Sequence, residues 1–178
     1  MDRIGESMII GLCGYSKVGK DSLCTELQNY DRFAFADVLK QEVTTMLKQV
    51  GIEADLWGEN KEEWRDMLVF WGRKRRSLDR DYWIKQMYVR LAPMEKKRVC
   101  VTDIRYPNEV RWIQAHHGLV LGIDRPGYGP ANEEEAISIR EIRIQHPEIQ
   151  WLMNDGYIQD LAALARKTIQ SYNVGRLS

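Results

Sequence analysis

A glycine-rich stretch near the N-terminus, GLCGYSKVGKDSLC (Gly11–Cys24), constrains the fold of this chain more than any other feature. Gly14, Gly19 and Lys20 match the pattern G-x-x-x-x-G-K, in which backbone amides surround phosphate oxygens and the lysine reaches the β- and γ-phosphates. The pattern has this meaning only between a buried strand and a helix. Met8–Cys13 is a short apolar run typical of a buried strand, and the residues after Lys20 favour a helix. We therefore predict a phosphate-binding loop, in preference to a strand–helix turn that binds nothing.

The residue after the lysine departs from the usual form of such a loop. Asp21 stands where a serine or threonine normally contacts magnesium, and Ser22 comes one position later. Either Asp21 contacts the ion, directly or through water, or Ser22 helps to hold the phosphates. The loop, which also contains Lys17, indicates a bound nucleoside triphosphate but does not identify the phosphate acceptor.

Predicted strands and helices alternate along most of the chain. This alternation is typical of an α/β fold, in which a parallel sheet is covered by helices on both faces. Asp37 is expected to cap one helix and Gly51 to end it. Strands are predicted at 8–13, 32–36, 98–102, 119–123 and 149–153; helices are predicted at 20–30, 37–50, 108–117 and 157–172, with two more between 55 and 94.

The composition favours one soluble domain. The chain has 178 residues, of which 44% are hydrophobic and 29% charged, and its 26 basic residues balance 26 acidic ones, so no overall field attracts nucleic acid or an anionic membrane. Three cysteines without a C-x-x-C pair argue against a disulfide framework or a zinc site. The start, MDRIGES, lacks the apolar core of a signal peptide. We expect a cytoplasmic protein that binds neither nucleic acid nor membranes.

Charged residues follow two of the predicted strands. Asp103 comes after the apolar run RVCVT, where a carboxylate can hold magnesium or its water, and Arg105 is expected at the same edge. Arg125 follows the strand at 119–123. Ligands of parallel sheets gather beyond the carboxyl ends of the strands, so these residues are candidates for the same site as the glycine loop. A helix cap with a surface ion pair is the alternative interpretation of Asp103 and Arg105.

Phosphoryl transfer between two anions requires cationic side chains around the transferred group. Arg65 lies beside an apolar helical stripe of Trp64, Leu68 and Trp71, where it could clamp a phosphate. A solvated helix arginine is the alternative.

A polar segment rich in proline and glycine, residues 126–143, resembles an excursion from the core. Arg125, Arg140 and Arg143 flank it, so it could be a lid that closes over a nucleotide; a mobile loop is equally consistent with the composition.

The basic run Arg73–Arg76 could suggest a nucleic-acid binder, but four consecutive helical residues wind around the axis, and a solvated helix end is favoured.

Seven motifs make the chain resemble bacteriophage-type deoxynucleoside monophosphate kinases from Met8 to about Leu164. In that family an aspartate followed by a serine or threonine is common after the loop lysine. In this chain the motifs are GYSKVGKDS, FADVLK, RDMLVFWG, DRDYW, VTDIRYPNE, GIDRPG and MNDG.

The resemblance implies a single P-loop kinase domain with a five-stranded parallel sheet, which uses ATP and Mg²⁺ to phosphorylate a deoxynucleoside monophosphate. It implies a core at about 8–54, 95–125 and 144–178, a helical acceptor-binding region at 55–94 and a lid at 126–143. By this resemblance, ATP would be bound by Gly14, Lys17, Gly19, Lys20, Asp21, Ser22, Arg125 and Asn154. Mg²⁺ would be bound by Asp21, Ser22 and Asp103, and the acceptor would be bound by Lys40, Arg65, Trp83 and Arg105. The catalytic residues would be Lys20, Arg65, Asp103 and Arg105.

Two departures and two alternatives accompany this resemblance. The family often has a proline where Val38 stands, and a histidine-serine-glutamate element in the lid where this chain has ANEEEA. RDMLVFWG and VTDIR also resemble animal-type phosphomevalonate kinases, although several tryptophans favour a nucleotide acceptor. A P-loop module that binds nucleotide without transferring phosphate is a further alternative, against which Arg65 and Arg105 argue. The sequence leaves open which bases are accepted and whether the molecule is a homodimer.

Overall fold

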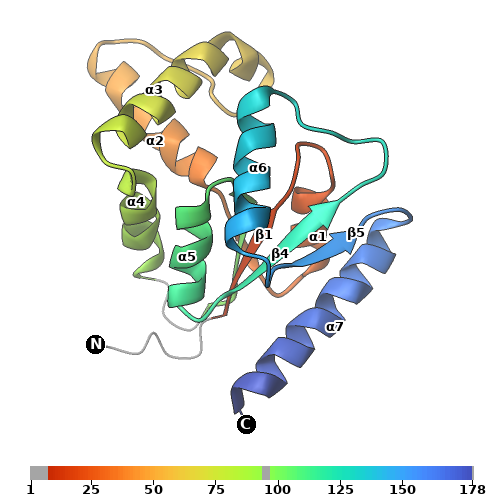
Figure 1. Ribbon diagram of the computed structural model, residues 1–178. Helices are drawn as coiled ribbons and strands as arrows, with labels where there is room; N and C mark the ends of the chain where they lie inside the picture. The colour runs from red at the N-terminus through yellow and green to blue at the C-terminus, as the bar shows by residue number, and fades with distance from the viewer. Residues whose placement is uncertain (1–7, 94–96, 178) are drawn as a thin grey trace. The chain divides into compact units, whose positions relative to one another are not determined.

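The computed structural model describes residues 8–93 and 97–177 (Figure 1). The N-terminal MDRIGES and the predicted end of the helical region at Met94 lie outside the described residues. The elements in chain order are β1 (Ile9–Cys13), α1 (Lys20–Glu26), β2 (Asp31–Phe33), α2 (Phe35–Gln49), the 3₁₀ helix η1 (Glu59–Trp64), α3 (Arg65–Leu78), α4 (Tyr82–Leu91), β3 (Val99–Ile104), α5 (Pro107–Ala115), β4 (Leu119–Asp124), α6 (Glu133–Gln145), β5 (Gln150–Met153) and α7 (Ile158–Leu177).

The five strands form one parallel sheet in the order β2-β3-β1-β4-β5. The central strand β1 pairs with β3 on one side, where Ile10 lies opposite Cys100, and with β4 on the other, where Ile10 lies opposite Leu119. All five residues of β1 are buried, as expected for a strand covered on both faces. The predicted five-stranded α/β fold is confirmed.

Helices cover both faces of the sheet (Figure 1). On one face, α5 contacts β1 and β4 and packs beside α6. Gly11 permits this close approach, because a Cβ atom there would lie 2.5 Å from Ile113 Cδ1 of α5. On the other face, α1 and α7 pack together over an apolar cluster, which includes Ile10, Leu12, Leu23, Leu121, Ile123, Leu152, Leu161 and Ala165.

The chain divides into two compact units. The first contains residues 8–33 and 97–177, and therefore the whole sheet; the second, Ala34–Pro93, is helical. The helical unit contains α2 as well as the helices after residue 55, because Val43 and Leu47 of α2 form a small core with Leu56. The predicted stripe of Trp64, Leu68 and Trp71 packs against this core.

A partly buried hydrogen-bond network centred on Glu42 joins the three α-helices of the second unit. The Glu42 carboxylate accepts hydrogen bonds from Trp71 Nε1 at 2.8 Å, Arg75 Nε at 2.7 Å and Tyr82 Oη at 2.6 Å. The Arg75 guanidinium also lies 4.8 Å from the Trp71 ring centre and 4.6 Å from that of Tyr82. One acidic side chain of α2 thus joins α3 and α4.

Three local predictions differ from the structure. The first helix ends at Glu26 and not near Tyr30, and α2 begins at Phe35, with Ala34 at its N-cap position, so the prediction that Asp37 caps this helix is wrong. The polar segment 126–143 contains much of an unpredicted helix, α6, which is held by the buried side chains of Ile139 and Ile142.

In the described part of the chain, no helix combines the length and hydrophobicity needed to cross a bilayer.

Candidate active site

The glycine loop has the backbone shape that its sequence predicts. Gly14 and Gly19 have φ angles of 139° and 107°, which favour glycine, and a Cβ atom at Gly14 would collide with the carbonyl oxygen of Ile123. Between them, Lys17 has a φ of 65°. Asn154, which is buried, donates from Nδ2 to the Val18 carbonyl at 2.7 Å. Asn154, which follows the last residue of β5, therefore stabilises the loop through this hydrogen bond.

Lys20 begins α1 and folds back over the loop. Its Nζ donates to the Gly14 carbonyl at 2.8 Å and to the Tyr15 carbonyl at 2.6 Å. Burial lowers the pKa of Lys20 below its ordinary value, while the nearby Glu135 carboxylate raises it and the Arg105 guanidinium lowers it further. The ammonium group is thus held beside the loop, within the electrostatic reach of two carboxylates, Glu135 and Asp21, and of the Arg105 guanidinium.

Asp21 follows Lys20 and connects α1 with the sheet. Its Oδ1 accepts from Arg32 Nε at 2.8 Å and from Thr102 Oγ1 at 3.0 Å. Although burial acts in the opposite direction, these two bonds hold the pKa of Asp21 below its ordinary value, so the carboxylate stays charged at neutral pH. No local sequence motif connects Arg32 or Thr102 with the loop, so these two partners of Asp21 were not predictable from the sequence.

The predicted magnesium ligands supply the right type of atom. Asp103 is half-buried at the end of β3, directly after Thr102, which binds Asp21, and Ser22 is exposed on the first turn of α1. Among residues 8–93 and 97–177 there is no cluster of three or more histidine, cysteine, aspartate or glutamate residues suited to a metal. The carboxylate and hydroxyl oxygens of Asp21, Asp103 and Ser22 fit a Mg²⁺ ion that is held mostly by phosphates and water, with one or two protein oxygens.

Arg105 follows β3 in a loop that is shaped by a buried carboxylate. Glu109 of α5 accepts from the backbone amides of Arg105 at 2.8 Å and Tyr106 at 3.2 Å. The Arg105 side chain is exposed. The loop therefore presents a guanidinium at the carboxyl edge of the sheet, within the electrostatic reach of Lys20.

Of the three arginines around the predicted lid, Arg125 lies beside the glycine loop. Its Nη1 is 3.5 Å from the Lys17 carbonyl, and its guanidinium lies 4.5 Å from the Tyr128 ring centre. Arg143 instead donates to both oxygens of Asp124 at 2.7 and 2.8 Å and covers the Trp151 ring. Arg140 is exposed on α6.

The predicted acceptor residues other than Arg105 belong to the helical unit. Arg65 begins α3, is exposed and pairs with Glu62 at 3.2 Å. Lys40 lies 5.8 Å from the ring centre of Trp57, which is 47% exposed. Trp83 is only 2% exposed and donates from Nε1 to the Gly72 carbonyl, so it acts in packing and offers no free ring to a ligand here.

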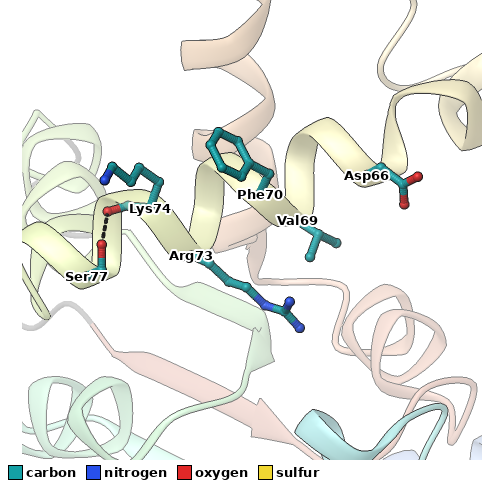
Figure 2. Close-up of a pocket in the computed structure, with 6 residues that line it drawn as sticks. All are labelled: Asp66, Val69, Phe70, Arg73, Lys74 and Ser77. Atoms are coloured by element: carbon teal, nitrogen blue, oxygen red, sulfur yellow. Dashed lines mark hydrogen bonds between the residues drawn. The ribbon is translucent and has the colours of Figure 1, made fainter.

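One face of α3 carries a shallow hollow of about 460 Å³ (Figure 2). Its apolar lining residues are Val69 and Phe70, and its charged lining residues, Asp66, Arg73 and Lys74, belong to the same helix. Figure 2 shows Arg73 and Lys74 leaving the helix in different directions, while Arg75 binds Glu42. The basic run therefore winds around α3, as expected, and does not form one cationic face.

The structure brings most of the predicted ATP residues together in the first unit. Lys20, Asp21, Arg125 and Asn154 surround or brace the glycine loop through the contacts given above. A role for Arg65 and Lys40 beside this loop stays a prediction. Sequence reasoning missed Glu135 of α6, whose carboxylate contacts the loop at Ser16; the sequence signal was Asn132 three residues before it, a helix-capping pattern.

Comparisons with known proteins identify the fold. No protein-family model matches the sequence, and no curated protein matches it significantly. Among solved structures, TT1252 from Thermus thermophilus is 17% identical, with 93% of this chain and 97% of that chain covered and a TM-score of 0.54.

Two similar structures are kinases. Dephospho-CoA kinase from Campylobacter jejuni is 12% identical, with 93% of this chain and 97% of that chain covered and a TM-score of 0.56. A gluconokinase from Sinorhizobium meliloti is 14% identical, with 97% of each chain covered and a TM-score of 0.52. The chain therefore has the same α/β fold as these structures.

Proposed function

We propose that this protein is an ATP-dependent kinase that phosphorylates a deoxynucleoside monophosphate. The observation that carries this proposal is the juxtaposition at one sheet edge of the glycine loop, the partly buried Lys20 and the guanidinium of Arg105. A protein that only binds nucleotide needs the first two features but has no need of a second cation beside them.

These residues suit direct phosphoryl transfer. Lys20 would hold the β- and γ-phosphates of ATP, and Arg105 would offset the repulsion between the donor and acceptor phosphates. Mg²⁺, when bound near Asp21 or Asp103, would neutralise further negative charge on the phosphates. An acceptor phosphate is already an oxygen nucleophile, so positioning and charge neutralisation suffice and no strong general base is required.

The helical unit supports a nucleotide as the acceptor. The motif resemblance points to a deoxynucleoside monophosphate, and Lys40 beside the half-exposed ring of Trp57 combines a phosphate-binding charge with an aromatic surface suited to a base. Arg65 at the start of α3 is the proposed second phosphate clamp.

Other small-molecule acceptors are the alternative. Two of the similar structures are a dephospho-CoA kinase and a gluconokinase, and two motifs also resemble phosphomevalonate kinases. A common fold supports many acceptors, so the fold does not favour one of them.

A panel of acceptors tests the proposal. ADP release from Mg²⁺-ATP would be measured with each deoxynucleoside and nucleoside monophosphate, and with phosphomevalonate, dephospho-CoA and gluconate. We expect the largest kcat/KM with one or more deoxynucleoside monophosphates. Turnover with phosphomevalonate or another non-nucleotide alone would overturn the proposed acceptor class but keep the kinase.

A further inference from the structure

A carboxylate from α6 contacts the phosphate-binding loop. Glu135 Oε1 accepts a hydrogen bond from the backbone amide of Ser16 at 2.9 Å, and Oε2 accepts one from the amide of Ala131 at 2.6 Å. Ser16 lies inside the G-x-x-x-x-G-K stretch, 119 residues away in the sequence. The side chain therefore bridges two loops of the first unit, the glycine loop and the segment before α6.

The placement of Glu135 is fixed by its helix. Asn132 caps α6 and accepts the backbone amide of Glu135 at 2.9 Å, while Ile139 and Ile142 anchor the next turns in the core. Glu134, one residue earlier, accepts from the Tyr106 hydroxyl at 2.9 Å. The first turn of α6 is thus held at both neighbouring loops, and Glu135 does not simply extend into solvent.

The chemistry of this contact resembles that of a phosphate in the same loop. A carboxylate and a phosphate both present negatively charged oxygens to backbone amides, and such amides are the groups with which the loop pattern binds nucleotide phosphates. The carboxylate is also close enough to Lys20 to favour its charged form. One anionic side chain therefore occupies a loop amide that a triphosphate would use, and it acts electrostatically on Lys20, which a triphosphate would also contact.

We propose that Glu135 is an internal phosphate mimic, which occupies the glycine loop without nucleotide and must leave it when a polyphosphate binds. This inference rests on the proposed function only in that the loop binds nucleotide phosphates. A phosphate and the Glu135 carboxylate cannot both accept from the Ser16 amide without repulsion, so polyphosphate binding displaces Glu135 from its bonds to Ser16 and Ala131. Nucleotide binding is thereby coupled to release of the first turn of α6.

Removal of the charge should strengthen nucleotide binding. In Glu135→Gln we expect about 3- to 10-fold lower Kd for ATP, because a partly exposed charge no longer competes for the loop. The change should be smaller for ADP and absent for adenosine, which has no phosphate. Glu133→Gln is the matched control, since it removes the same charge from the same helical turn at an exposed position.

Binding would be measured by titration calorimetry on the full chain, with inorganic tripolyphosphate as a probe that carries no base. Tighter binding of ATP and tripolyphosphate by Glu135→Gln than by Glu133→Gln supports the proposal, even if the unmodified protein binds neither. Equal or weaker binding by Glu135→Gln overturns it, and weaker binding would indicate that Glu135 helps to hold the metal or the ligand. If no folded variant binds ATP or tripolyphosphate, the proposed kinase function fails together with this inference.

Hydrogen exchange provides a second measurement that does not depend on a substitution. Addition of ATP should speed exchange of the Ala131 amide, which loses its carboxylate partner, and slow exchange of the Ser16 amide, which gains a phosphate. Slower exchange at both amides would mean that Glu135 stays in place with nucleotide bound, and would overturn the proposal.

Discussion

At the scale of single residues, Lys20 has the clearest consequence for activity. Its ammonium group lies over the glycine loop, bonded to two loop carbonyls and partly removed from water. In Lys20→Met we expect kcat to fall by at least about 100-fold, because the loss of one preorganised charge on the transferred phosphate has an effect of that order. Steady-state kinetics with the preferred acceptor would measure the change.

The matched control for this substitution is Lys167→Met, which removes an exposed lysine from α7. It should keep kcat within about two-fold, because surface substitutions have small effects. Circular dichroism should show that both variants are folded. A Lys20→Met protein with nearly full turnover would remove this residue from the proposed catalytic set.

At the scale of elements, the Glu42 network determines how firmly α2, α3 and α4 are joined. Its carboxylate accepts three hydrogen bonds from side chains of the other two helices. Burial raises the pKa of Glu42, but the bonds from Tyr82, Trp71 and Arg75 outweigh it and keep the pKa below its ordinary value. In Glu42→Gln we expect the free energy of unfolding to fall by about 1–3 kcal/mol, since at least one donor loses its acceptor.

Urea unfolding followed by tryptophan fluorescence would measure this loss. Four of the six tryptophans, Trp57, Trp64, Trp71 and Trp83, lie in the helical unit, so the emission reports mainly on that unit. Glu63→Gln is the control, because Glu63 is exposed on η1. If the two variants unfold at the same urea concentration, the network does not stabilise the unit.

Elements with a strong apolar pattern were predictable, and those defined by distant partners were not. The run before Gly14 predicted β1, since a buried strand needs only consecutive apolar residues. Helix α6 was not predicted because residues 126–143 are mostly polar, and Ile139 and Ile142 are the principal buried apolar residues of this helix. Trp83 was predicted as an acceptor-binding residue from the motif DRDYW, and its burial could not be inferred from that motif.

At the scale of the whole molecule, the alternation of strands and helices was predictable except for α6, and the site was predictable only in part. The motif spacing located the glycine loop, Lys20 and the loop after β3 at one edge of the sheet, because parallel strands end at the same edge. The contacts of Asp21 with Arg32 and Thr102, and of Glu135 with Ser16, join segments far apart in the sequence. Side-chain partners of this kind leave no periodic signal.

The proposed reaction is transfer of the γ-phosphoryl group from ATP, held by the glycine loop, to a deoxynucleoside monophosphate, with ADP as the other product. The most direct measurement follows the label from [γ-³²P]ATP after incubation with each deoxynucleoside monophosphate and Mg²⁺, with the products separated by chromatography. We expect label to appear in a deoxynucleoside diphosphate, in an amount equal to the ADP formed. Label that stays in ATP, or that appears only in inorganic phosphate with every deoxynucleoside monophosphate, would contradict it.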